Sequence, residues 1–258
     1  MGERDDRPAD AIRRDVEEIL RRADGSEAPV GAASAGAGVG AVRGTLDREL
    51  REVRAAILRM GLLVEQSIRA AVDALSRHDA AAAEAVIHGD RAVNEMQREI
   101  AALITATIAT QGPVARDLRF LLALDHVTYE LERIGDHAGS VAKQARKLAP
   151  FPPVARAVLV EEMGELAARI LHDILRALVD VDAAAAREVA ARDDEIDHRY
   201  HQLFDEMVVA MRGDPELVEP GTRLLFAAHY VERIGDRVTN IAEDVVFLET
   251  GQAEDLNQ

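Results

Sequence analysis

Two identical acidic pentapeptides carry the side chains best suited to chemistry in this chain. The sequence Glu-Arg-Ile-Gly-Asp occurs at 132–136 and again at 232–236. On a helix, the Glu and the Asp of each copy lie one turn apart on the same face, where two carboxylates repel each other by roughly a few tenths of a kcal/mol. Clustered carboxylate oxygens are hard ligands for divalent or trivalent metal ions. The motif therefore predicts a shared cation at two pairs of ligands, Glu132 with Asp136 and Glu232 with Asp236.

Each pentapeptide also contains an arginine, Arg133 or Arg233, which could neutralise the acids locally. Adjacent side chains on a helix do not face each other, so we expect both arginines to point to a different side from the neighbouring Glu. A cation is then the simpler answer to the repulsion. We predict that these two arginines contact partner proteins, together with Arg116 and Arg119.

A second set of oxygen donors lies in the helical stretch before each pentapeptide. Asp90 and Asn94 correspond to Asp193 and Asp197 at an offset of 103 residues. Each pair is again four residues apart and shares one helix face. If the two helices of each half lie antiparallel, the pairs meet across a groove, as in carboxylate-rich helix bundles. We therefore add these four residues to the predicted metal ligands.

The opposing interpretation is that the acidic stripes are solvated helix faces, as expected in a chain with 47 acidic residues. The retention of all five motif residues in both halves favours a site instead. Gly135 and Gly235 support this view, because glycine inside a helix costs about 1 kcal/mol relative to alanine. A close helix contact or an approaching ligand would explain both glycines.

The duplication extends through most of the chain. An Asp followed by four Ala occurs at Asp79 and again at Asp182, and both aspartates are expected to be helix N-caps. A period near 100 residues is too long for a solenoid repeat and indicates two similar domains in tandem. The predicted domains are a first bundle (45–150), a second bundle (151–251), an extension with an Ala/Gly-rich linker (1–44) and a tail (252–258).

Proline positions and apolar periodicity predict three long helices in each half. In the first half we expect helices over 47–76, 80–110 and 114–148, and in the second half over 154–181, 183–212 and 217–250. Each half then folds as an up-down-up bundle. The predicted fold class is all-α, with two tandem, pseudo-symmetric three-helix bundles and a flexible N-terminal extension.

Composition excludes several classes of function. A formal net charge of −16 disfavours nucleic acid as a partner, because that affinity comes mainly from Lys and Arg. The chain has no Cys, which removes disulfides and thiolate metal sites from consideration. No apolar run approaches the roughly 18 to 20 residues that span a bilayer. We expect a cytoplasmic protein that reaches a membrane only through its partners.

Four segments resemble the PhoU family of phosphate-transport accessory proteins: 89–94, 113–119, 131–137 and 230–243. The resemblance covers roughly residues 45–251. Two departures are His229, where many members have Arg, and the N-terminal extension. The resemblance implies two three-helix bundles whose acidic motifs bind iron, zinc, manganese or magnesium. It implies the same metal ligands as above, with Glu132, Asp136, Glu232 and Asp236 foremost.

The resemblance further implies a negative regulator of phosphate uptake and phosphate-starvation signalling. Its expected partners are the ATPase subunit of a phosphate ABC transporter and the sensor histidine kinase of the phosphate two-component system, and we also expect a homodimer. Two alternative functions compete with this one. A di-metal oxidase requires bundle-facing Glu-x-x-His pairs, which the sequence lacks, so we expect no enzyme. A metal-free scaffold or chaperone-like protein that binds partner helices through its acidic stripes stays open.

Overall fold

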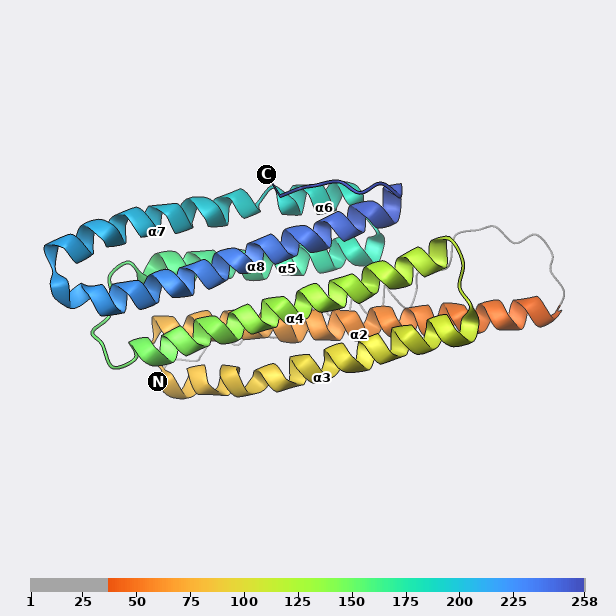
Figure 1. Ribbon diagram of the computed structural model, residues 1–258, viewed down its shortest axis with the longest axis horizontal. Coiled ribbons are helices and arrows are strands. Elements are labelled where there is room, and N and C mark those ends of the chain that lie inside the picture. Colours follow the sequence, from red (N-terminus) through yellow and green to blue (C-terminus); the bar gives the residue numbers. More distant parts are fainter. Residues whose placement is uncertain (1–36, 258) are drawn as a thin grey trace, which may run out of the picture.

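The structure, a computed structural model, describes residues 37–257, with side chains from Gly44 onward. Within that range all regular structure is helical, and the helices lie along the long axis of the molecule (Figure 1). The first half contains α2 (Ala37–Ser76), α3 (Ala80–Gln111) and α4 (Arg116–Leu148). The second half contains α5 (Ala157–Asp180), α6 (Ala183–Ala190), α7 (Asp193–Gly213), the 3₁₀ turn η1 (Pro215–Leu217) and α8 (Val218–Thr250).

Helix N-caps confirm the duplicated starts of the middle helices. The Asp79 carboxylate accepts hydrogen bonds from the backbone N–H groups of Ala81 and Ala82, both at 2.9 Å. The Asp182 carboxylate accepts one from Ala185 at the same distance. Each cap satisfies backbone donors that have no partner inside the helix.

At the N-terminal side, α2 begins earlier than predicted. Residues 37–44, which we assigned to the end of a linker, continue the helix. Extending an existing helix needs no new nucleus, so even a glycine-containing segment can prolong it. The remainder of the predicted extension and linker, residues 1–36, lies outside the described residues.

The prediction of one unbroken helix over 183–212 was wrong. The chain leaves the helical pattern at Ala191 and Arg192, and α7 starts afresh at Asp193. Arg192 reaches across to α5, where its Nη1 donates to Asp173 Oδ2 at 2.5 Å. The new helix opens with acidic residues, which interact favourably with the positive end of the helix dipole. The break has no counterpart in the first half, where α3 is continuous.

Both halves share one apolar core. In the first half α2, α3 and α4 pack against one another, and in the second half α5 packs with α6, α7 and α8. The halves meet where α4 runs beside α8 and α2 contacts α5 (Figure 1). Buried side chains from all of these α-helices form a single continuous cluster. The α3 helix and the α6–α7 pair therefore lie on opposite edges of the molecule (Figure 1).

Two glycines show that the contact between α2 and α5 has approximate two-fold symmetry. A Cβ atom added to Gly61 would lie 2.5 Å from Leu175 Cδ1, and one added to Gly164 would clash with Val72. Gly61 corresponds to Gly164, and Val72 to Leu175, at the same 103-residue offset. The duplicated helices thus pack on each other through equivalent contacts. In the described part of the chain, no helix is both long and apolar enough to cross a membrane.

Candidate metal centres

The first acidic cluster consists of Asp90 and Asn94 on α3 and Glu132 and Asp136 on α4. The Asn94 side chain donates to Asp90 Oδ2 at 2.9 Å and to the Asp90 backbone carbonyl at 3.1 Å. The other Asp90 carboxylate oxygen is buried and has no hydrogen-bond partner among the described residues. The predicted meeting of the two helices is thus observed, with α3 and α4 packed together.

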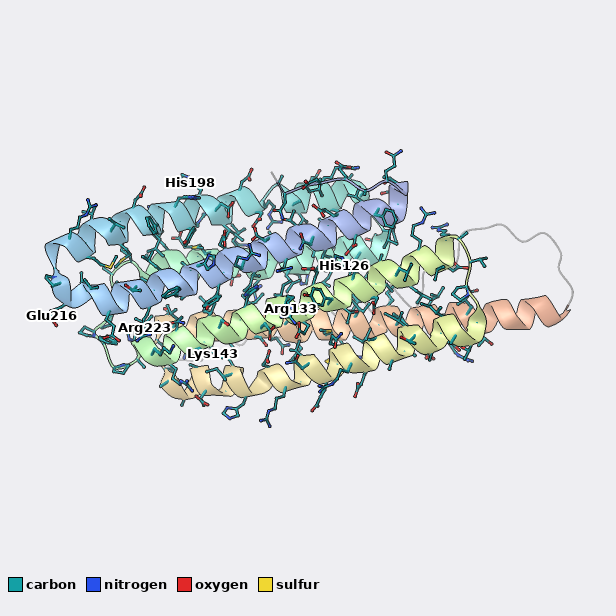
Figure 2. All side chains as sticks on the ribbon, in the orientation of Figure 1. His126, Arg133, Lys143, His198, Glu216 and Arg223 are labelled. Atoms are coloured by element: carbon teal, nitrogen blue, oxygen red, sulfur yellow. The ribbon has the colours of Figure 1, made fainter. Side chains whose placement is uncertain are left out.

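The acids of the first cluster are electrostatically coupled. Burial, and then the Asp136 charge, raise the pKa of Asp90, while Lys143 on α4 opposes the shift (Figure 2). Burial and Asp136 also raise the pKa of Glu132, with a smaller contribution from Asp90. Like charges at short range disfavour the ionised form. The carboxylates of α3 and α4 therefore interact electrostatically across the contact between the two helices.

The second acidic cluster consists of Asp193 and Asp197 on α7 and Glu232 and Asp236 on α8. Asp193 is only 7% exposed. The Thr239 hydroxyl reaches Asp193 Oδ2 at 3.5 Å, a long and weak hydrogen bond. Asp193 Oδ1, Asp197 Oδ1 and Glu232 Oε2 are buried oxygens that no described residue hydrogen-bonds.

In the second cluster, burial and repulsion between carboxylates shift the pKa of one aspartate especially far. Burial first, and then the charges of Asp197, Asp236 and Glu232, raise the pKa of Asp193 to about 7. Burial and Asp236 raise the pKa of Asp197 and of Glu232 as well. An acid whose pKa is raised on folding weakens the folded state at neutral pH, when it must be ionised. A bound cation would offset this cost.

The two motif glycines are explained by close contacts, as predicted, but the contacts differ. A Cβ on Gly135 would lie 3.1 Å from Val93 Cγ1. A Cβ on Gly235 would overlap Asp193 Oδ1 and would lie 3.2 Å from Ile196 Cδ1. Glycine at 235 therefore makes room for a carboxylate, whereas glycine at 135 makes room for an apolar side chain.

The expectation that both motif arginines point away from the neighbouring Glu was wrong for Arg133, whereas Arg233 contacts only the Asp of its motif. Arg133 Nε lies 2.8 Å from Glu132 Oε2, and Arg133 Nη1 lies 3.0 Å from Asp136 Oδ2. Arg233 Nη1 donates to Asp236 Oδ2 at 2.6 Å. Although adjacent residues diverge on a helix, the long arginine side chain can bend back to its neighbour and reaches the acid three residues ahead. Both arginines partly neutralise the clusters.

Arg116 and Arg119 lie apart from both acidic clusters, at the start of α4. They line a cavity of about 470 Å³ together with Asp180, Val181, Leu248 and Glu249. The Arg119 guanidinium also lies 5.7 Å from the centre of the Phe247 ring. Their predicted role in partner binding stays a prediction.

A metal ion is not accommodated by the side chains as they stand. Within the described residues, no group of three or more His, Cys, Asp and Glu side chains is arranged to hold one. The donor chemistry nevertheless fits a hard cation, since both clusters contain buried, unpartnered carboxylate oxygens. Arg133 and Arg233 contact acids of the two clusters.

Sequence reasoning missed two features next to the clusters. One is Thr239, which lies four residues after Gly235 and whose hydroxyl contacts Asp193. Its counterpart in the first half is Gly139, so the repeat alone did not indicate it. The other is Glu130, 2% exposed, at the contact between α4 and α8. It accepts hydrogen bonds from Arg237 at 3.3 Å and from Asn240 at 3.2 Å. Their counterparts are His137 and Ser140, so the duplication did not indicate this bond network either.

Comparison with known proteins identifies clear relatives. Residues 57–145 and 160–245 each match the PhoU domain. A phosphate-specific transport system accessory protein PhoU homolog from Clostridium acetobutylicum is 36% identical over 216 residues, which cover 83% of this chain and 99% of the relative. A homolog of the same description from Caulobacter vibrioides is 37% identical over 205 residues, covering 79% of this chain and 89% of the relative.

Solved structures with a similar fold come from the same family. The crystal structure of PhoU from Pseudomonas aeruginosa superposes with a TM-score of 0.77 at 34% identity, covering 80% of this chain and 100% of that chain. The phosphate transport system regulatory protein PhoU from Streptococcus pneumoniae gives a TM-score of 0.77 at 32% identity, covering 81% of this chain and 99% of that chain.

Proposed function

The chain belongs to the PhoU family, and we propose that it regulates phosphate transport as a non-catalytic, metal-binding adaptor. In this proposal it couples the ATPase subunit of a phosphate ABC transporter to a sensor histidine kinase on the cytoplasmic side of the membrane. It acts there as a negative regulator of phosphate uptake and of the phosphate-starvation response, as a homodimer. The relatives named as accessory proteins of phosphate-specific transport systems support the transport part of this proposal.

One observation carries the metal part of the proposal: both halves bring two helices' acids together at corresponding positions and leave buried carboxylate oxygens unpartnered. Such oxygens are costly unless a hydrogen bond or a cation compensates them. The first cluster would hold a cation with Asp90, Glu132 and Asp136, and Asn94 as a neutral donor. The second would hold one with Asp193, Asp197, Glu232 and Asp236. Iron, zinc, manganese and magnesium are all candidates.

A bound cation would supply positive charge that links the middle and third helices of each half. The chain's own residues set the helix spacing and reduce the repulsion between the acids. Gly135 and Gly235 let the helices approach, and Arg133 and Arg233 reduce the repulsion before a cation binds. Arg116 and Arg119, at the separate cavity near the start of α4, are our candidates for partner contact.

The alternative function is a metal-free scaffold that binds basic partner helices through its acidic stripes. The observation that favours it is that the described side chains form no ready-made metal site, while Arg133 already contacts both acids of its motif. The two functions differ in what neutralises the carboxylates. A cation neutralises them in the first, and a partner's Lys or Arg side chains do so in the second.

Metal quantification tests the proposal. The full-length protein, purified from a native-like host without chelator, is expected to contain bound metal by elemental analysis. Glu132→Gln and Asp236→Asn should each lower the metal content, because each removes a carboxylate from one cluster. Asp125→Asn and Asp205→Asn, exposed acids on α4 and α7, serve as matched controls and should retain it.

Pull-down of the transporter ATPase and the kinase from the same organism tests the adaptor role. The wild-type protein should retain both, and the metal-depleted variants should retain less of each. Full retention of both partners by metal-free protein would support the scaffold instead. Wild-type protein that contains no metal and binds none after dialysis against Mn²⁺, Zn²⁺, Fe²⁺ or Mg²⁺ would contradict the metal proposal.

A further inference from the structure

We propose that the two acidic clusters are inequivalent, and that the second cluster, on α7 and α8, is the tighter cation site. This inference rests on the proposed cation binding. It goes further by assigning an order of loading: the second cluster fills first, and the first cluster fills only at higher cation concentration. Three independent structural differences between the halves support it.

The first difference is the donor set. Asn94, on α3, is replaced in the second half by Asp197. The Asn94 amide donates a hydrogen bond to one carboxylate oxygen of Asp90 at 2.9 Å. Asp197 makes no such bond and leaves its Oδ1 buried and unpartnered. The second cluster therefore has one more carboxylate, and ligand charge is a main determinant of affinity for hard cations.

The second difference is the depth of the aspartate that begins each pair. Asp193 is 93% buried, at the start of α7, with Oδ1 against the backbone of Gly235 and unpartnered. Asp90, its counterpart, lies within a continuous helix and is less buried. The side chain that meets Gly135 is Val93 instead. Asp193 is the first residue of α7, directly after the helix break, and its carboxylate lies in the contact between α7 and α8.

The third difference is how far arginine side chains neutralise the acids of each cluster. Arg133 contacts both motif acids of the first cluster, Glu132 at 2.8 Å and Asp136 at 3.0 Å. Arg233 contacts only Asp236. Glu232 has instead a histidine neighbour, His229, whose Nδ1 lies 3.3 Å away and carries charge only when protonated. The second cluster therefore keeps more uncompensated negative charge in a more buried position, where charge interactions are stronger.

A reciprocal exchange of the one differing donor tests the inference. Mn²⁺ is titrated into the full-length, chelator-treated protein, and bound metal is followed by equilibrium dialysis and by the loss of the free-ion electron paramagnetic resonance signal. The wild-type protein should show two classes of site. Asp197→Asn should weaken the tight class about tenfold and leave the weak class unchanged. Asn94→Asp should strengthen the weak class by a similar factor.

Gly235→Ala provides a second measurement that does not alter any donor. The added methyl group would displace the Asp193 carboxylate, so the tight class should weaken, whereas Gly135→Ala should leave it unchanged. Far-UV circular dichroism verifies that each variant is folded. Two sites of equal affinity in the wild type, or an Asp197→Asn protein that retains the tight class, would overturn the inference while leaving cation binding intact. A wild-type protein that binds no Mn²⁺ at either cluster would overturn the proposed metal binding itself.

Discussion

At the residue scale, a group of interacting titratable side chains outside the acidic clusters lies between α4 and α8. His126 Nδ1 lies 2.7 Å from Asp244 Oδ2, and His126 Nε2 lies 3.4 Å from the buried Glu130. Figure 2 shows His126 on α4. Burial raises the pKa of Asp244 to about 6, against the opposing effect of His126. Burial opposes the charged imidazole, but Asp244 and Glu130 outweigh it and raise the pKa of His126.

The direction of the pH effect follows from these two shifts. Asp244 binds its proton more tightly in the folded state, so its contribution to stability is complete below the reference pKa of 3.8 and is lost as the pH rises through about 6. The contribution of His126 is complete below 6.5 and is lost as the pH rises through its raised pKa. Both contributions therefore decline in the same direction, from acidic to alkaline pH.

We predict that the stability advantage of the wild-type protein over the double variant His126→Gln/Asp244→Asn shrinks by about 1 kcal/mol between about pH 5.5 and about pH 8. Most of this comes from Asp244, because solvent screens the half-exposed His126. Urea denaturation of metal-free protein at the two pH values measures the difference. Asp205→Asn should show no such change, and a pH-independent advantage of the wild type would refute the prediction.

At the element scale, glycines set how closely the helices of the two halves approach. Gly164 on α5 lies against Val72 of α2, whose branched side chain has little freedom to move away. Gly61 makes the equivalent contact with Leu175. By contrast, nothing lies within 4 Å of a Cβ added to Gly89, on the exposed side of α3. The same substitution should thus have opposite effects at different glycines.

Gly164→Ala should lower the free energy of unfolding by about 1–3 kcal/mol, because overpacking at a buried helix crossing forces side chains or backbone to shift. Gly89→Ala should raise it by about 0.5–1 kcal/mol through helix propensity alone. Urea denaturation followed by far-UV circular dichroism compares the two variants. Equal effects at both positions would show that the contact between α2 and α5 is looser than the structure indicates.

At the scale of the whole molecule, the two bundles are not independent domains in the energetic sense. Buried side chains of both halves form one continuous core, and the contact of α4 with α8 joins the two acidic motif helices directly. Leu131 lies within this core on α4 and is fully buried. We therefore expect loss of packing in one half to destabilise the other.

Leu131→Ala should destabilise the whole chain by about 2–5 kcal/mol, as expected for a truncated core leucine. Hydrogen exchange should quicken in α8 as well as in α4, because both unfold in one cooperative step. Leu122→Ala, at a 56% exposed position on the same helix, is the control and should change little. Unchanged exchange in α8 of the Leu131 variant would indicate separately folding halves.

Much of this protein is determined by local pattern and repetition. The all-α class, the tandem arrangement and the Asp79 and Asp182 caps follow from proline positions, heptad-like spacing and cap chemistry, which act within a few residues. The convergence of α3 on α4, and of α7 on α8, follows from antiparallel bundle geometry. The repeat in the sequence was therefore enough to indicate which acidic helices pack together, whereas their joint role as metal ligands stays a prediction.

Tertiary structure alone decided the features that distinguish the halves. Next to the break before Asp193, Arg192 hydrogen-bonds Asp173 of α5 and Asp193 packs against Gly235 of α8, and neither contact is visible from helix propensity. The inward bend of Arg133 and the burial of Glu130 beside Arg237 likewise depend on neighbours distant in sequence. Side-chain conformation and burial are set by such long-range contacts, whereas periodicity reports only which face of a helix a residue occupies.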